Sequence, residues 1–141
     1  GAPIVLHEDG GQTRDFVHIK DVVGAHIMVL ECSKANFQIF NVGSGRSDLV
    51  SRLAQIVAQT CGSTRAYEAP GLFRINTARN SFMDIGALKK LGWKPQYTLQ
   101  NNAEDYIKWL RGGNVPAVKN LKTILKKMEA DGVVRRSSTA H

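Results

Sequence analysis

Arg14 lies in the stretch of the chain whose residues offer the most chemistry. It follows a Gly10-Gly11 turn and precedes Phe16–Ile19, a β-branched and aromatic run that is typical of a short strand. A guanidinium at the mouth of that strand, beside backbone N–H donors of the turn, suits a phosphate or diphosphate. The alternative is a solvated arginine paired with Asp15, and these residues taken alone favour that alternative.

The elements on either side of this arginine follow from the residue pattern. Residues 3–6 are predicted to form a strand and residues 7–11 a turn, which together with the strand at 16–19 would make a hairpin. Asp21 is predicted to cap a helix over residues 22–31. That helix is apolar almost all round, so we expect it to be covered on more than one side.

The middle of the chain is predicted to run from a strand through a glycine loop into a helix. Residues 37–42 alternate like a strand and run into Gly43-Ser44-Gly45. Ser47 is the expected cap of the next helix, which should end before Gly62. Beyond it the pattern predicts a short strand, a short helix stopped by Gly92 and a longer amphipathic helix, over residues 64–69, 83–91 and 97–111.

Residues 114–141 differ from the rest and are predicted to be a separate basic part, leaving 1–113 as the main domain. The whole chain of 141 residues has a formal charge of +7, and the segment from Asn114 holds six Lys or Arg against two acids. Pro116 is the expected first residue of an amphipathic helix whose lysine stripe we interpret as a solvated face. Residues 135–141 are expected to be a disordered end.

Composition excludes several classes of protein. No apolar run approaches the roughly 18 residues of a membrane span, and the start of the chain lacks the pattern of a signal peptide, so we expect a cytoplasmic protein. Cys32 and Cys61 have no metal-binding or redox spacing and are expected to be reduced structural thiols. The sequence therefore predicts no metal site.

Four aromatic or imidazole side chains are expected to serve the fold and not chemistry. His18 and His26 have no carboxylate or nucleophile partner in the sequence, so we assign them no catalytic role. Trp93 and Trp109 each follow an apolar helical face and are predicted to be core anchors.

Four stretches, in this order, are similar to the motifs of one family. Residues 9–22 (DGGQTRDFVHIKDV) match a DGxQxRDFVyVxDV signature, residues 40–45 (FNVGSG) match YNIGsG, and residues 83–95 match aDiskakkeLGWkP. Residues 97–109 then match a closing amphipathic helix. The chain thus resembles extended short-chain dehydrogenase/reductases, specifically the NAD-dependent nucleotide-sugar epimerases and dehydratases such as UDP-glucose 4-epimerase.

The resemblance implies an α/β fold that is only the C-terminal portion of such an enzyme. It would hold short strands and about four to five helices, and would lack the N-terminal Rossmann half. The chain has no GxxGxxG loop and no Tyr-x-x-x-Lys pair, and Gly43-Ser44-Gly45 is no substitute for the former. We therefore expect no catalytic residues and no cofactor bound by this chain alone, with NAD implied for the full-length enzyme.

The resemblance also implies a set of substrate contacts. Arg14 matches the arginine that pairs with the phosphates of the nucleotide, Phe16 lines the same cleft, and Asn41 opens the glycine loop near the nucleotide. A second diphosphate arginine falls in a segment that departs from the family pattern. Arg79 fits its place best by spacing, and Arg74 is the alternative.

Partners and function follow from the same comparison. Without the Rossmann half, residues 22–30 would expose an apolar face, which predicts docking of that half, self-association or a remodelled fold. We expect the substrate-binding portion of a nucleotide-sugar epimerase or dehydratase, with a nucleotide sugar as ligand. A stand-alone binding or complementing module is the alternative. A basic nucleic-acid binder is disfavoured because the aromatic residues expected among the lysines are absent.

Overall fold

A computed structural model describes residues 4–65, 67–113 and 121–137, and within them the chain is mixed α/β. Its short strands and handful of helices agree with the class expected from the sequence. The helices, in chain order, are α1 (Ile19–Glu31), the 3-10 turn η1 (Ser33–Ala35), α2 (Val50–Thr60), α3 (Gly86–Lys90), α4 (Leu99–Gly112) and α5 (Leu121–Ala130).

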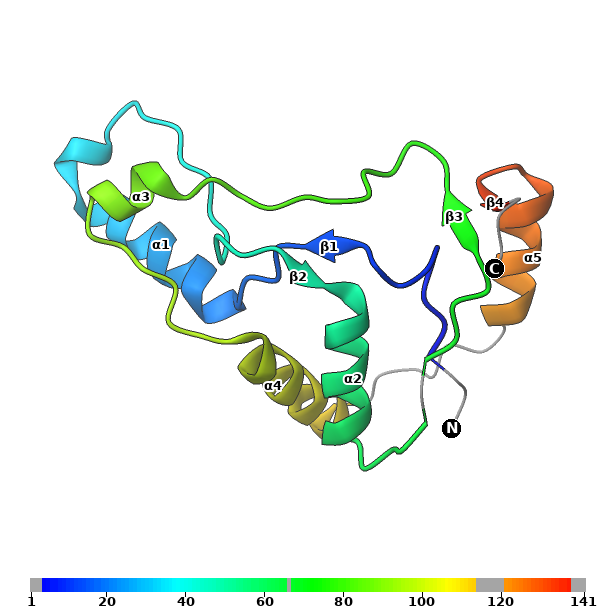
Figure 1. Cartoon of the computed structure of the whole chain (residues 1–141). Coiled ribbons are helices and arrows are strands. Elements are labelled where there is room, and N and C mark those ends of the chain that lie inside the picture. Colours follow the sequence, from blue (N-terminus) through cyan, green and yellow to red (C-terminus); the bar gives the residue numbers. More distant parts are fainter. Residues whose placement is uncertain (1–3, 66, 114–120, 138–141) are drawn as a thin grey trace.

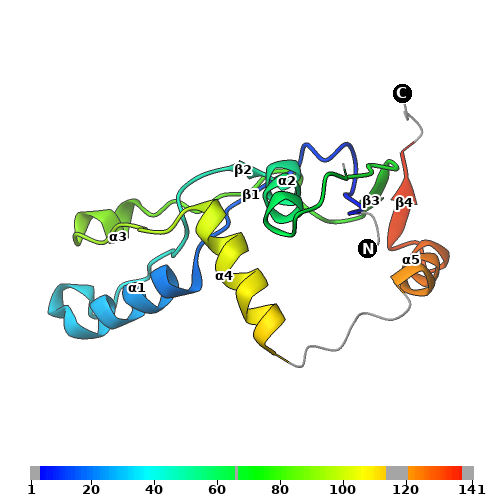
Figure 2. The same ribbon diagram turned by 90° about the horizontal axis from the view of Figure 1, so that it is seen from below.

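The strands form two small antiparallel sheets. β1 (Thr13–Arg14) pairs with β2 (Asp48–Leu49), and β3 (Leu72–Arg74) pairs with β4 (Val134–Arg136). Figure 1 shows an elongated arrangement, with α1 and α3 side by side at one end and β3, β4 and α5 at the other. The view in Figure 2 agrees and places β1, β2, α2 and α4 between these ends. The doubly wound sheet of a Rossmann half is not among the described elements.

Helix α1 begins three residues earlier than predicted and has a different cap. His18 is the N-cap, and its Nδ1 accepts a hydrogen bond from the Lys20 amide at 3.1 Å. The predicted Asp21 cap is wrong: its buried carboxylate instead accepts hydrogen bonds from the Gln96 and Tyr97 amides, at 2.8 and 3.1 Å. The carboxylate oxygens of Asp21 therefore satisfy backbone donors of a distant loop and do not cap α1.

Several predicted strands lack the partner that a ladder requires. Residues 16–19 form no strand, so the predicted hairpin is wrong, and the paired residues lie just before them in β1. Residues 37–42 are not assigned to a strand either. The strands expected at 3–6 and 64–69 reduce, within the described residues, to a single parallel bridge between Val5 and Glu68.

The glycines that end helices were predicted correctly, whereas the residues expected to cap helix starts were not. Gly62 and Gly92 have φ values of 70° and 98°, the left-handed conformation that ends a helix. The predicted Ser47 cap is wrong, because Asp48 and Leu49 pair with β1 and Leu49 becomes the N-cap of α2. α4 starts with a reciprocal capping box between Thr98 and Asn101.

The core lies between α1 and α3. Ala25, Ile85, Leu88 and Trp93 are buried together, and the prediction that Trp93 anchors a core is confirmed. The same prediction for Trp109 is wrong, because its side chain is 62% exposed. α4 turns a different stripe inward, formed by Leu99, Ala103 and Ile107.

The segment after residue 120 contacts the earlier part of the chain through β4. Arg135 and Arg136 pair with Phe73 and Leu72, so the predicted disorder is wrong for these two residues. Val134 is almost fully buried. The predicted helix start at Pro116 lies outside the described residues, and the boundary between 1–113 and 114–141 stays a prediction.

The described part of the chain has neither a membrane-spanning helix nor a cluster of metal-binding side chains. None of its helices has the length and apolar content that crossing a bilayer requires. It also contains no group of three or more His, Cys, Asp or Glu side chains placed to hold a metal ion.

Candidate functional site

The guanidinium of Arg14 is held by backbone carbonyls. Its Nη1 donates to the Thr13 carbonyl at 2.7 Å and to the Arg79 carbonyl at 2.8 Å. The alternative, a pairing with Asp15, does not occur, and within the described residues no ion pair joins Arg14 to a carboxylate. The side chain is thus oriented by neutral acceptors on two adjacent segments, and its positive charge is not neutralised locally.

Asp15 faces the glycine loop instead. Its carboxylate accepts hydrogen bonds from the amides of Ser44 at 2.6 Å, Gly45 at 3.0 Å and Met83 at 3.1 Å. Burial by itself raises the pKa of this carboxyl, but the hydrogen bonds from Ser44, Met83 and Gly45 outweigh it and hold the pKa below its ordinary value. An internal carboxylate therefore occupies the loop donors that a phosphate would need.

Gly43 allows that approach. A Cβ at this position would lie 2.6 Å from Asp15 Oδ2 and 2.6 Å from Met83 Cβ, which is closer than atoms pack. The glycine in the motif thus serves the contact between the loop, β1 and the segment before α3.

Arg79, the favoured second diphosphate arginine, is paired with acids. Its guanidinium contacts the carboxylate of Glu8 and both oxygens of Asp9, the latter at 2.8 and 2.9 Å. The side-chain hydrogen bond between them lowers the pKa of Asp9 and raises the pKa of Arg79. A diphosphate would have to replace these carboxylates, so Arg79 is less available to an anion than Arg14.

The other predicted contacts are spread over the molecule. Arg74 is exposed in β3, opposite Val134 of β4, in the sheet that does not contain Arg14. Phe16 is half-buried, and its carbonyl accepts a hydrogen bond from Asn102 at 3.0 Å. Asn41 is exposed, three residues before the loop amide that binds Asp15. The structure therefore links the Asn41 segment to Arg14 and places Arg74 elsewhere.

The sequence did not predict a polar cluster around His18. This buried ring stacks on Tyr97 with centroids 4.2 Å apart, and its Nε2 lies 3.3 Å from Asp105. Lys20 contacts the same carboxylate at 2.8 Å, and its hydrogen bond lowers the pKa of Asp105. Because the partners are 85 positions apart for Lys20 and Asp105, no local pattern could reveal the cluster.

The His18 cluster joins the start of α1 to α4. Nδ1 of the ring accepts from the Lys20 amide, so in the neutral ring the proton is on Nε2 and points to Asp105. Every polar atom of the ring then has a partner inside the fold. The arrangement positions two helices and offers no unpaired base.

Comparisons with known proteins agree with the motifs. The family model "NAD dependent epimerase/dehydratase family" matches residues 1–43. A dTDP-L-rhamnose 4-epimerase of Burkholderia thailandensis is 34% identical over 108 residues, which are 76% of this chain and 30% of that protein. A putative UDP-glucose 4-epimerase of Methanocaldococcus jannaschii is 30% identical over 112 residues, 78% of this chain and 35% of that protein.

Solved structures of epimerases are also similar to this chain in fold. The UDP-glucose 4-epimerase of Thermotoga maritima with UDP-glucose matches with a TM-score of 0.67 and 27% identity, over 78% of this chain and 35% of that one. The UDP-glucose-4-epimerase of Stenotrophomonas maltophila, with NAD and formylated UDP-arabinopyranose, matches with a TM-score of 0.68 and 28% identity over the same shares.

The chain belongs to the NAD-dependent epimerase/dehydratase family, as its motifs predicted. It spans about a third of the length of the relatives that it matches.

Proposed function

We propose that this chain is the substrate-binding portion of an NAD-dependent nucleotide-sugar epimerase or dehydratase, with Arg14 contacting the diphosphate. One observation carries the proposal: the Arg14 guanidinium is oriented by two carbonyls and has no carboxylate partner among the described residues. A fixed, un-neutralised guanidinium keeps its remaining N–H donors for an anion and loses little side-chain entropy on binding.

The surroundings of Arg14 support a nucleotide-sugar site. Asp15, the next residue, ties β1 to the loop that follows Asn41, so both motif residues belong to one connected part of the fold. Phe16 continues the chain on the other side with a half-buried ring. Relatives with similar sequence and fold were solved with UDP-glucose or a UDP-arabinopyranose derivative.

Catalysis is assigned to another part of the full-length enzyme. The sequence printed here has neither a GxxGxxG loop nor a Tyr-x-x-x-Lys pair, and the donors of Ser44 and Gly45 are bound to Asp15. In this proposal the chain orients the nucleotide sugar, and NAD is held by the portion that makes up the other two-thirds of a full-length relative.

The outer face of α1 is the proposed docking surface for that portion. Four apolar side chains are 49–86% exposed and recur every three or four residues on one side of the helix: Ile19, Val23, Ile27 and Leu30. Phe37 and Ile39, shortly after α1, are exposed almost completely. An apolar surface of this extent indicates a partner, and the two-thirds of a relative outside this chain is the partner of suitable origin.

Isothermal titration calorimetry with UDP-glucose and dTDP-glucose tests the role of Arg14. Arg14→Ala should weaken binding by about 1.5 to 3 kcal/mol, because charge-assisted hydrogen bonds to the diphosphate are lost. Arg111→Ala, which removes an exposed arginine at the end of α4, is the matched control and should leave binding unchanged. Equal losses of binding affinity for both variants would mean that Arg14 acts only through the net charge of the chain.

Supplying the cofactor-binding half of a relative as a second chain tests the docking surface. The two chains together should form a complex and give NAD-dependent turnover, and an Ile27→Asp, Leu30→Asp variant should prevent both. Turnover by this chain alone would show that the assignment of catalysis to another portion is wrong. Dimerisation of the chain with no binding of the added half would favour self-association instead.

A further inference from the structure

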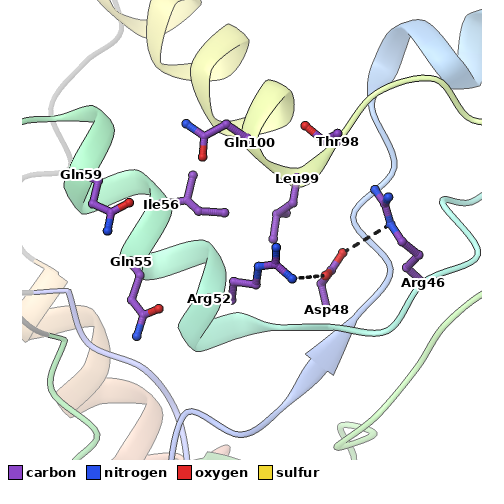
Figure 3. Close-up of a pocket in the computed structure, with 9 residues that line it drawn as sticks. All are labelled: Arg46, Asp48, Arg52, Gln55, Ile56, Gln59, Thr98, Leu99 and Gln100. Atoms are coloured by element: carbon purple, nitrogen blue, oxygen red, sulfur yellow. Dashed lines mark ion pairs between the residues drawn. The ribbon is translucent and has the colours of Figure 1, made fainter.

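A pocket whose lining includes Arg46, Asp48 and Arg52 lies outside the Arg14 contacts. It has a volume of about 540 Å³ and is bounded by α2 and the first turn of α4. Figure 3 shows Arg46 and Arg52 reaching the carboxylate of Asp48 from opposite sides. β1 and β2 pair Arg14 with Asp48 in register, but the Arg14 guanidinium contacts backbone carbonyls whereas Asp48 faces this pocket.

Among the described residues, most guanidinium donors of Arg46 and Arg52 have no hydrogen-bond partner. Arg46 Nε lies 3.9 Å from Asp48 Oδ2, and Arg52 Nη1 lies 3.7 Å from Asp48 Oδ1, both beyond hydrogen-bond length. Arg46 makes one long hydrogen bond, of 3.4 Å, to the Tyr97 carbonyl. Two cations thus face one carboxylate, so the wall is net positive and its donors are open to an added anion.

Asp48 holds this pair together. Its side chain is only 11% exposed, while those of Arg46 and Arg52 are 50% and 65% exposed. Its Oδ2 is buried without a hydrogen-bond partner in the described structure, so charge attraction to the two arginines is its main compensation. A buried acid that draws two exposed arginines to one point preorganises them for a shared ligand.

The rest of the lining suits a hydroxyl-rich molecule. Gln55 and Gln59 stand one turn apart on α2 and both line the pocket, where each offers a donor and an acceptor. Ile56 and Leu99 also line the pocket and add apolar surface, which can contact the C–H face of a sugar ring.

We propose that this pocket binds an anionic sugar, with its phosphate or carboxylate between Arg46 and Arg52 and its hydroxyls on Gln55 and Gln59. Nothing in this inference requires Arg14. The site would let the chain bind a charged sugar separately from the nucleotide-sugar diphosphate, either as a regulator or as a second ligand.

Calorimetry and amide NMR on the full chain test the proposal, with glucose 1-phosphate, glucuronate, glucose and inorganic phosphate as probes. Glucose 1-phosphate or glucuronate should bind saturably and shift the side-chain amide signals of Gln55 and Gln59. The stronger of the two tells whether phosphate or carboxylate is preferred. Glucose should bind at least tenfold more weakly, because it lacks the charge. Phosphate binding as tight as that of the sugar phosphate would overturn the role of the sugar.

Variants separate this site from general charge. Arg46→Gln and Arg52→Gln should each weaken binding about tenfold, as expected for one lost charge-assisted contact. Arg111→Ala should leave it unchanged, and thermal unfolding should show that all three variants are folded. Failure of both anionic sugars to bind, or equal weakening by Arg111→Ala, would overturn the proposal. Because the side-chain amide signals of Gln55 and Gln59 report on this pocket, failure of this site and of the proposed diphosphate site are distinguishable.

Discussion

The two faces of α1 are built from similar residues and have opposite surroundings. On the inner face Ala25 is 1% exposed and packs against Ile85, Leu88 and Trp93. On the outer face Leu30, as apolar as any of these, is 86% exposed. The difference is not composition but what lies opposite: α3 and its flanking loop cover one face, and no described element covers the other. An apolar residue becomes core only where the chain supplies a facing surface.

Shortening a core side chain should have the largest effect. Leu88 is fully buried, so Leu88→Ala should lower the free energy of unfolding by about 2 to 5 kcal/mol through lost burial and a cavity. Leu30→Ala, the matched change on the outer face, should alter it by less than about 0.5 kcal/mol. Urea unfolding followed by circular dichroism measures both. Similar losses for the two variants would mean that the outer face is covered in solution.

A substitution in the glycine loop of residues 43–45 should lower the free energy of unfolding by a smaller amount. Gly43→Ala places a methyl group 2.6 Å from both Asp15 and Met83, and should cost about 1 to 3 kcal/mol of stability as overpacking. Gly112→Ala has open space around its added Cβ and should be neutral or slightly stabilising. The same unfolding experiment applies, and an unaffected Gly43→Ala protein would contradict the close approach of loop and β1.

The carboxylate of Asp15 predicts a dependence on pH. Its pKa in the folded chain is below the ordinary value of 3.8, so its stabilising effect is complete above about pH 3.8 and is lost as the pH falls through the lower folded value. Asp15→Asn should cost about 1 to 2 kcal/mol at neutral pH, because an amide nitrogen then faces N–H donors.

The same variant should flatten the rise of stability with pH on the acid side. Unfolding free energies measured from pH 2.5 to 6 check this, with exposed Asp131→Asn as the control. An identical pH slope in the wild-type and Asp15→Asn proteins would contradict the role of Asp15.

The smallest effect on stability is expected on the outer face of α1. Ile27→Ser removes an apolar side chain that is 50% exposed, and should change the unfolding free energy by at most about 0.5 kcal/mol. Binding of a cofactor-binding half should nevertheless weaken, because that side chain would be buried in the complex. A loss of stability with no loss of binding would reverse the assignment of the two faces.

Prediction from sequence succeeded where the information is local. The glycine stops at Gly62 and Gly92 and the burial of Trp93 follow from conformation and spacing within one element. The Arg14 motif and its neighbours indicated the family, because identity and order together are specific. The strand predicted at 37–42 is not formed, since a strand depends on a partner and none is present among the described residues. The prediction for Trp109 is wrong for a related reason, because the packing of α4 against α2 decides which stripe of α4 is buried.

In the candidate site, the sequence identified candidate residues, and the tertiary structure decided their contacts. The sequence marked Arg14, Phe16, Asn41, Arg79 and Arg74, and it preferred Arg79 to Arg74 on spacing alone. The structure distinguishes them by their acceptors, because Arg14 contacts carbonyls, Arg79 contacts carboxylates and Arg74 lies in another sheet. The pairs that decide this are some 65 to 71 positions apart, so only the fold brings them within reach of each other.

The sequence by itself determined the family, the helical segments, the glycine stops and the absence of the dinucleotide-binding and Tyr-x-x-x-Lys motifs, because each depends on residue types at short spacing. Only the tertiary structure decided which charges are neutralised, which apolar face is covered and where two arginines meet around Asp48. Neutralisation and burial are properties of pairs in space, and the chain order does not fix those pairs until the elements pack.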